Sequence, residues 1–258
     1  MEIDLQDTKA KTIVYKSTRD CKFKGLDSNF CSDTGLPDSD FTMVINGGCG
    51  TGKSLFTENL VRQFYSINKG KKTVWSYIAY CCPEASLDSY ENSFVKDLNS
   101  DDVYDSLDTD ILNEILDKAI ETKESGTKKN PKHSLLILDD LGSELKQGGR
   151  DGGVLKLLKK TLQTFRHMHL SVIICTQNIM SMHSHHRNIV RNLIQFKSSS
   201  IPEIERIWLE FGSKFTKKEF IEDFWPFIFD EKYNFLQVDR HNDFQMCKNY
   251  NILDIKKI

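Results

Sequence analysis

The chain has 258 residues, 39% of them hydrophobic and 28% charged, so it can bury one substantial core and is expected to form one main domain. Its seven cysteines are an odd number without a CxxC pair or metal-ligand spacing, and reduced thiols in a cytosol-like compartment are the simplest interpretation. The N-terminus is polar and no apolar run approaches the ~18 residues that a membrane span needs, so we expect a soluble protein that is neither secreted nor inserted in a membrane.

The formal net charge of −2 conceals two blocks of opposite sign. Residues 84–124 hold thirteen acids against three bases, whereas residues 128–218 hold sixteen bases against seven acids. A basic block is what a polyanionic partner requires. An ordinary mixed surface is the alternative, because blocks of sequence need not form one face of the molecule.

Residues 1–40 are polar with little periodicity beyond 12–15, and we interpret them as an N-terminal extension with one strand at the domain edge. Residues 41–46 form a short apolar run that leads into a glycine-rich loop, and apolar residues at helical spacing follow over 55–67. Strand, loop and helix in this order match the phosphate-binding pattern GxxxxGK(S/T).

In this loop, glycine lets backbone N–H groups turn inward and approach phosphate oxygens closely, and the following helix points its positive end at the same phosphates. We expect Lys53 to reach the β- and γ-phosphates of ATP and the Ser54 hydroxyl to bind Mg²⁺. The nucleotide-binding residues are therefore predicted to be Gly47, Gly48, Cys49, Gly50, Thr51, Gly52, Lys53 and Ser54.

Strands and helices alternate through the rest of the chain. The patterns predict strands at 73–80, 134–138, 170–176, 193–197 and 234–239, and helices at 105–123, at 154–168 and, broken at Gly212, within 202–224. This alternation predicts an α/β fold of the P-loop NTPase class (RecA/ASCE-like), a three-layer sandwich around a mostly parallel sheet. We assign residues 41–240 to this ATPase domain and residues 241–258 to a C-terminal tail.

Carboxylates end one of these buried strands. Asp139 and Asp140 follow four apolar residues and are expected at the edge of the sheet beside the phosphate loop, where parallel sheets bind ligands. Asp139 would hold Mg²⁺ and Asp140 would orient and polarise the attacking water. Two helix-capping aspartates are the alternative, and Glu144 is a possible substitute for Asp140. Gln177 ends the next strand, where it would contact the γ-phosphate or the water, or only cap the strand.

An arginine usually completes such a site, often from a neighbouring subunit. The candidates are Arg150, Arg166, Arg187 and Arg191, and the sequence does not choose among them. His183, His185 and His186 lack metal-ligand spacing, so residues 183–192 are interpreted as a polar connection facing a phosphate backbone rather than a zinc site. The glycine-rich run 147–153 is a nucleic-acid-contacting loop or a plain surface loop.

Five segments, in order over residues 41–240, resemble the DNA-packaging ATPases of poxviruses, other large nucleocytoplasmic DNA viruses and virophages, which belong to the FtsK/HerA group of P-loop translocases. These segments are NGGCGTGKS, LLILDD, FRHMHLSVIICTQN, NIVRNLIQF and YNFLQVD. The Arg166-His167 pair before a strand ending in Thr176-Gln177, followed by Arg191-Asn192, is the most specific part of the resemblance.

The resemblance implies a motor that hydrolyses ATP with Mg²⁺ and translocates double-stranded DNA into a viral capsid. It also implies a homo-oligomeric ring with ATP at subunit interfaces, and Asp139, Asp140 and Gln177 as acidic pair and sensor. Capsid or portal-site proteins would be partners, and the host cytoplasm (the viral factory) and the virion would be the locations. The wider FtsK/HerA group usually has Glu where Asp140 stands.

Two other functions fit parts of the sequence. The segment LLILDDLG resembles the acidic motif of AAA+ helicase loaders of the DnaC/IstB kind, which are nucleotide-switched adaptors. Gln177, the return to a strand at 234–239 and the lack of an arginine-bearing lid bundle favour the motor over the loader. A protein that uses ATP only as a structural switch is the third reading, and the intact Lys53, Ser54, Asp139 and Asp140 count against it.

Overall fold

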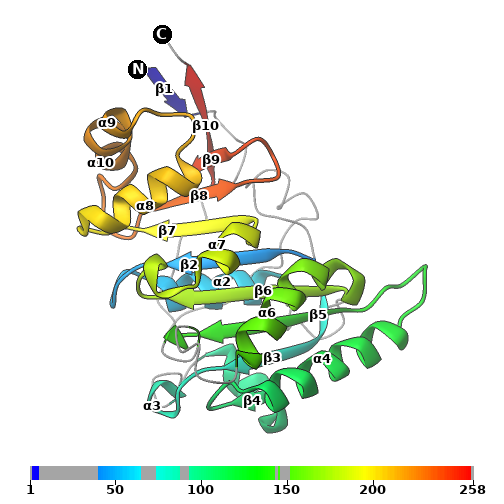
Figure 1. The fold of residues 1–258 in the computed structure, drawn as a ribbon. Helices are drawn as coiled ribbons and strands as arrows, with labels where there is room; N and C mark the ends of the chain where they lie inside the picture. Colours follow the sequence, from blue (N-terminus) through cyan, green and yellow to red (C-terminus); the bar gives the residue numbers. More distant parts are fainter. Residues whose placement is uncertain are drawn as a thin grey trace.

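The computed structural model describes residues 2–5, 40–64, 74–87, 93–142, 145 and 152–256. Within these residues, ten strands form one sheet in the order β1-β10-β9-β8-β7-β2-β6-β5-β3-β4 (Figure 1). The strands are β1 Glu2–Leu5, β2 Thr42–Asn46, β3 Trp75–Cys81, β4 Val103–Tyr104, β5 His133–Asp139, β6 Leu170–Thr176, β7 Asn192–Phe196, β8 Phe235–Asp239, β9 Gln245–Lys248 and β10 Asn251–Lys256.

The sheet has a parallel and an antiparallel half. Six neighbouring strands from β7 to β4 pair in parallel, with β2 between β6 and β7. From β7 onward, β8, β9, β10 and β1 are added antiparallel. The parallel half forms because buried strands are connected by helices that cross the faces of the sheet. This arrangement confirms the expected α/β P-loop fold.

Helices cover both faces of the sheet. The longer ones are α2 Lys53–Phe64, α4 Thr109–Glu124, α6 Gly153–Thr164 and α8 Ile201–Phe211. The shorter helical segments are α3 Glu84–Leu87, η2 Phe94–Asp97, η3 Ser100–Asp102, η4 Phe165–Met168, η5 Ile179–Ser181, α7 Ser184–Ile189, α9 Lys217–Glu219, η6 Phe220–Phe224 and α10 Trp225–Ile228. None of the described helices is both long and apolar enough to cross a membrane.

Side chains alternate between two hydrophobic cores, one on each face of the sheet. On β2, Met43 and Ile45 belong to the core that α2 covers with Phe56 and Leu60. Val44 points to the opposite core, to which α4, α6 and α8 contribute. In Figure 1, α4, α6 and α7 lie in front of the sheet and α2 lies behind it. The three-layer sandwich that the sequence predicts is therefore confirmed.

Several local expectations were wrong. The connection expected at 183–192 contains α7, and the predicted helix at 105–123 begins only at Thr109, because the Asp108 side chain caps it through the Ile111 N–H at 2.8 Å. The tail expected at 241–258 contains β9 and β10, which extend the sheet. Their sequences, QMCK and NILDIK, do not alternate strictly between apolar and polar residues, so neither shows the pattern of a half-buried strand.

The N-terminal extension contributes one described strand. β1 pairs antiparallel with β10 at the edge of the sheet, with Glu2 opposite Lys256 and Leu5 opposite Leu253. Figure 1 shows the two strands side by side at the end of the sheet farthest from β4. The strand suggested around 12–15 lies outside the described residues.

Candidate active site

The glycine-rich loop joins the end of β2 to the start of α2. Gly50 and Gly52 have φ angles of 72° and 108°, which side chains with a Cβ rarely adopt. The Gly47 N–H donates to the Thr176 carbonyl at 3.1 Å, and Thr51 Oγ1 donates to the Gly48 carbonyl at 2.8 Å. The loop is thus anchored to β6 and held in a turn that only glycine permits at two positions.

Aromatic side chains pack directly against this loop. A Cβ at Gly47 would lie 2.7 Å from Phe196 Cβ, and one at Gly52 would lie 3.4 Å from the ring of Tyr233. The first of these distances is closer than real Cβ contacts allow, so packing against Phe196 requires glycine at position 47. Phe196 and Tyr233 come from β7 and from the residues before β8, and the sequence analysis did not identify them.

The Lys53 ammonium group and the positive N-terminal end of α2 both lie at the glycine-rich loop. Lys53 Nζ donates to the carbonyl oxygens of Gly47 at 2.6 Å and Gly48 at 3.1 Å. Ser54 is exposed in the first turn of α2, and this turn contains no acid that would offset the positive end of the helix. The lysine, the exposed hydroxyl and the unopposed helix terminus fit a Mg²⁺-bound triphosphate.

Asp139 lies at the end of β5 and is 5% exposed. Tyr80 on β3 donates its hydroxyl to Asp139 Oδ2 at 2.7 Å. Asp139 stands opposite Cys175 on β6, whose Sγ lies 3.4 Å from the Thr57 hydroxyl of α2. Burial first, and then the Asp139 carboxylate, raise the pKa of the Cys175 thiol well above its usual value. Asp139 is therefore held in a fixed position beneath the start of α2, as a buried Mg²⁺ ligand would need to be.

The structure brings Asp140 and Gln177 together. Gln177 Nε2 donates to Asp140 Oδ2 at 2.6 Å, and the Asp140 N–H donates to the Cys175 carbonyl at 3.2 Å. Asp140 has a left-handed φ of 57°. It is half-buried and Gln177 is exposed, so the pair is open to solvent at the C-terminal edge of β5 and β6. A carboxylate held by an amide in this way can accept a hydrogen bond from water.

A buried acid that the sequence analysis missed connects the loop to its surroundings. Glu203 of α8 is 4% exposed and accepts hydrogen bonds from Asn46 Nδ2 at 2.9 Å, from the Ile179 N–H at 2.9 Å and from the Ser198 hydroxyl. Asn46 directly precedes the loop, and Ile179 follows Gln177 by two residues. Glu203 had no sequence signal, because an acid on an amphipathic helix normally faces solvent.

The arginine candidates have different environments. Arg187 is buried and paired with Glu210 at 3.0 Å, so the expectation that it faces a phosphate backbone was wrong. Arg166 is exposed, and the Arg191 guanidinium lies 4.8 Å from the centroid of the Phe165 ring. Both precede β6 and β7, at the edge of the sheet opposite the loop. Arg150 and Glu144 lie outside the described residues.

The histidine-rich segment is partly buried within α7. His186 Nε2 bonds to the Leu155 carbonyl at 3.0 Å, and the His185 N–H donates to His183 Nδ1 at 3.3 Å. Burial first lowers the pKa of His186, and the charges of neighbouring His183, His185 and Lys159 add to this. His186 therefore packs α7 against α6 rather than forming part of an open polar connection.

Comparison with protein families identifies the relatives of the chain. The profile of the poxvirus A32 protein family matches residues 28–231, which is most of the chain. The chain belongs to the poxvirus A32 protein family. This membership confirms the resemblance to viral genome-packaging ATPases of the FtsK/HerA type that the motifs indicated. No curated protein matches the chain in a sequence search.

Solved structures similar to this A32-family chain share its fold. The genome packaging NTPase B204 of Sulfolobus turreted icosahedral virus 2, in complex with AMP, superposes with a TM-score of 0.58 at 19% identity, covering 83% of this chain and 98% of B204. B204 of Sulfolobus turreted icosahedral virus, described as a DNA-packaging ATPase, gives 0.57 at 18% identity over the same shares. ATPases 2 and 3 of EssC from Geobacillus thermodenitrificans give 0.50 at 12% identity, covering 85% of this chain and 41% of EssC. These matches place the A32-family chain among P-loop ATPase folds.

Proposed function

We propose that this chain is an ATP-hydrolysing motor that translocates double-stranded DNA and packages a viral genome into its capsid. One observation carries the proposal: three adjacent parallel strands each deliver one part of a hydrolytic site at the same edge. β2 delivers the phosphate loop, β5 delivers Asp139 and Asp140, and β6 delivers Gln177. The crystallised complexes of B204 with AMP, ATP-γS and AMPPCP support a nucleotide as the ligand.

Each residue has a role that follows from its position. Lys53 releases its bonds to the Gly47 and Gly48 carbonyls and contacts the β- and γ-phosphates. Ser54 and Asp139 would hold Mg²⁺, and the ion would supply neutralisation of the phosphate charge. Asp140 orients the attacking water and accepts its proton. Gln177, already bonded to Asp140, holds that carboxylate and senses the γ-phosphate.

A second copy of the chain completes the site. Seven-residue strands such as β6 are about 20 Å long, so Arg166 and Arg191 at their N-terminal edge lie far from the loop of their own subunit. In a homo-oligomeric ring, the exposed Arg166 of one subunit is the better placed of the two to reach the nucleotide of its neighbour. Such an arginine contributes roughly 10³- to 10⁵-fold to hydrolysis.

DNA is the partner that best fits the basic block. Lys156 and Lys160 are exposed on α6, in the same block as Arg166. Phosphate contacts of this kind are independent of base sequence, as a packaging motor requires. We assign the protein to the viral factory in the host cytoplasm and to the virion, with capsid or portal-site proteins as further partners.

Two substitutions test the hydrolytic site. Lys53→Ala is expected to abolish nucleotide binding or hydrolysis, because it removes the charge that faces the phosphates. Asp140→Asn is expected to keep ATP binding and to lower hydrolysis by about 10²-fold or more, because it removes the base. Asparagine tolerates the left-handed backbone at this position, so the fold is retained. Nucleotide binding by calorimetry and phosphate release are measured in parallel.

Lys129→Ala and Asp117→Asn are matched controls at exposed positions, and both should behave as wild type. Unchanged turnover in Asp140→Asn would contradict the assigned role and transfer it to Glu144. Full binding and hydrolysis in Lys53→Ala would contradict the whole site.

A further inference from the structure

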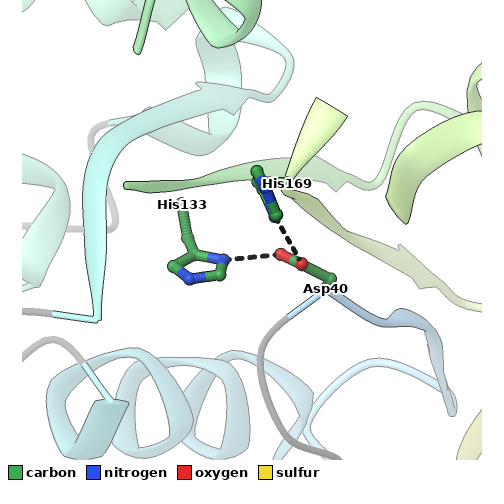
Figure 2. A group of neighbouring side chains, drawn as sticks. All are labelled: Asp40, His133 and His169. Carbon is green, nitrogen blue, oxygen red and sulfur yellow. Dashed lines mark hydrogen bonds and ion pairs between the residues drawn. The ribbon is translucent and has the colours of Figure 1, made fainter. Parts of the chain in front are cut away.

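Three side chains converge at the edge of the sheet opposite the nucleotide site. His133 Nδ1 lies 2.7 Å from Asp40 Oδ1, and His169 Nδ1 lies 3.0 Å from Asp40 Oδ2. Figure 2 shows both imidazole rings directed at the one carboxylate. One potential ligand atom from each residue lies within 4.8 Å of the other two. Among the described residues, no other group of three His, Cys, Asp or Glu side chains meets in this way.

The three residues come from the N-terminal ends of adjacent strands. Asp40 precedes β2, His133 begins β5 and His169 precedes β6. The same strands carry the phosphate loop, Asp139–Asp140 and Gln177 at their other ends. The cluster therefore lies beneath the proposed active site, one strand length away from it.

The backbone holds the ligands in place. Asp40 and His169 have left-handed φ angles of 65° and 50°, a conformation that most side chains rarely adopt. The Asp40 N–H donates to Ser171 Oγ at 3.0 Å, and the Ser134 N–H donates to the His169 carbonyl at 2.9 Å. Trp75 Nε1 also donates to Ser171 Oγ at 3.3 Å. The convergence therefore belongs to the fold and not to freely rotating surface side chains.

The donor set has the chemistry of a transition-metal site. Two imidazole nitrogens with one carboxylate suit Zn²⁺ and other divalent first-row transition-metal ions, whereas Mg²⁺ prefers oxygen ligands alone. The two carboxylate oxygens of Asp40 each face one Nδ1 atom, so a single ion can reach all three side chains. The His169 side chain is 35% exposed, which leaves room for a water ligand.

We propose that Asp40, His133 and His169 bind one divalent transition-metal ion of the Zn²⁺ class. The ion ties the N-terminal ends of β2, β5 and β6 together and stabilises the strands that present the nucleotide site. To bind the ion through Nδ1, each neutral imidazole carries its proton on Nε2, so the ion takes the place of the hydrogen bonds between the Nδ1 atoms and Asp40. The alternative is a hydrogen-bonded His–Asp–His cluster that binds no metal, and the test must distinguish it from a metal site.

The test uses the full chain, stripped with EDTA, returned to excess Mg²⁺ and kept without nucleotide. Calorimetric titration with ZnCl₂ should find one ion per chain, and CoCl₂ should give the visible absorption bands of a low-coordinate Co²⁺ site. Asp40→Asn and His169→Asn should weaken binding by about 100-fold or more, since loss of even an outer partner of a metal ligand costs 10- to 100-fold. A hundredfold excess of Zn²⁺ over its dissociation constant should raise the unfolding midpoint by about 5 °C in wild type.

The variants separate the site from other zinc ligands. Asparagine accepts the left-handed backbone at 40 and 169, and His133→Gln tests the third ligand in regular strand geometry. The double variant His183→Asn/His185→Asn should bind Zn²⁺ as wild type does, and Cys49→Ser controls for the exposed thiol. No binding in wild type, undiminished binding in Asp40→Asn and His169→Asn, or loss of binding in the His183/His185 variant would overturn the proposal. Because nucleotide is absent, each result is independent of whether the chain hydrolyses ATP.

Discussion

Asp140 occupies a backbone conformation that bears on its identity. The wider FtsK/HerA group usually has Glu at this position, whereas this chain has the shorter Asp. The left-handed φ of 57° is tolerated by Asp and Asn far better than by most other residues. The 2.6 Å bond from Gln177 then fixes the direction of the carboxylate. Backbone geometry together with Gln177 thus gives a physical reason for Asp at this site.

Cys49 offers a chemical probe of the phosphate loop. It is exposed at the tip of the loop, whereas burial raises the pKa values of Cys81, Cys82 and Cys247 to about 12 and leaves their thiols unreactive. We expect N-ethylmaleimide to label Cys49 and inhibit hydrolysis, and a non-hydrolysable ATP analogue to slow labelling by at least about tenfold, because bound phosphates cover the loop. Peptide mapping by mass spectrometry measures the rate at this residue.

Cys49→Ser is the matched control and should hydrolyse ATP in the presence of the reagent. This control separates the effect of labelling Cys49 from labelling of the other cysteines in the chain, including Cys21 and Cys31. Labelling of Cys49 at the same rate with and without the analogue would argue against phosphate binding at this loop.

At the scale of elements, Glu203 couples three segments around the site. It joins α8 to the end of β2 and to η5, which directly follows the Gln177 segment. Asn46 also donates to Gln195 on β7 at 2.6 Å, so the residue before the loop is held from two sides. A change at Gln177 or in the loop would therefore act on α8 through buried hydrogen bonds.

Glu203→Ala should lower the free energy of unfolding by about 3 kcal/mol, because it leaves several buried donors without an acceptor. It should also weaken nucleotide binding, since Asn46 loses one of its anchors. Urea unfolding and calorimetry measure the two effects. Glu205→Ala, on the same helix, removes only a partly exposed pair with Lys217 and should cost less than about 1 kcal/mol. Equal losses in the two variants would contradict the coupling role of Glu203.

Much of the fold could be predicted from the sequence because its signals are local. β6 was predicted residue by residue, since its seven positions are all buried and four consecutive apolar residues, 172–175, form its centre. α7 and β4 were missed because six and two residues are too few to show a period.

Contacts between distant residues could not be predicted in the same way. The Asp40 cluster joins residues 93 and 129 positions apart, and Glu203 lies 157 positions from Asn46. Pairing of this kind depends on the order of strands in the sheet, which a single sequence does not encode in its periodicity.

At the scale of the whole molecule, two sets of functional groups lie at opposite ends of the parallel strands. The phosphate loop and its acids lie at one edge of the parallel half, and Arg166, Arg191 and the Asp40 cluster lie at the other. Of the candidate arginines that the structure describes, Arg166 and Arg191 lie about a strand length from the loop, and Arg187 is paired with Glu210. This geometry favours a ring in which subunits act on one another, and a motor over an isolated switch.

The most direct test is ATP hydrolysis with and without long double-stranded DNA, beside a sizing measurement with a non-hydrolysable nucleotide. The account predicts a homo-oligomer with nucleotide, stimulation of hydrolysis by DNA that falls steeply as salt rises, and no stimulated hydrolysis in Asp140→Asn. A monomer whose hydrolysis is unaffected by DNA, or is stimulated only by a partner helicase as a loader would be, would contradict the assignment of a DNA-translocating motor.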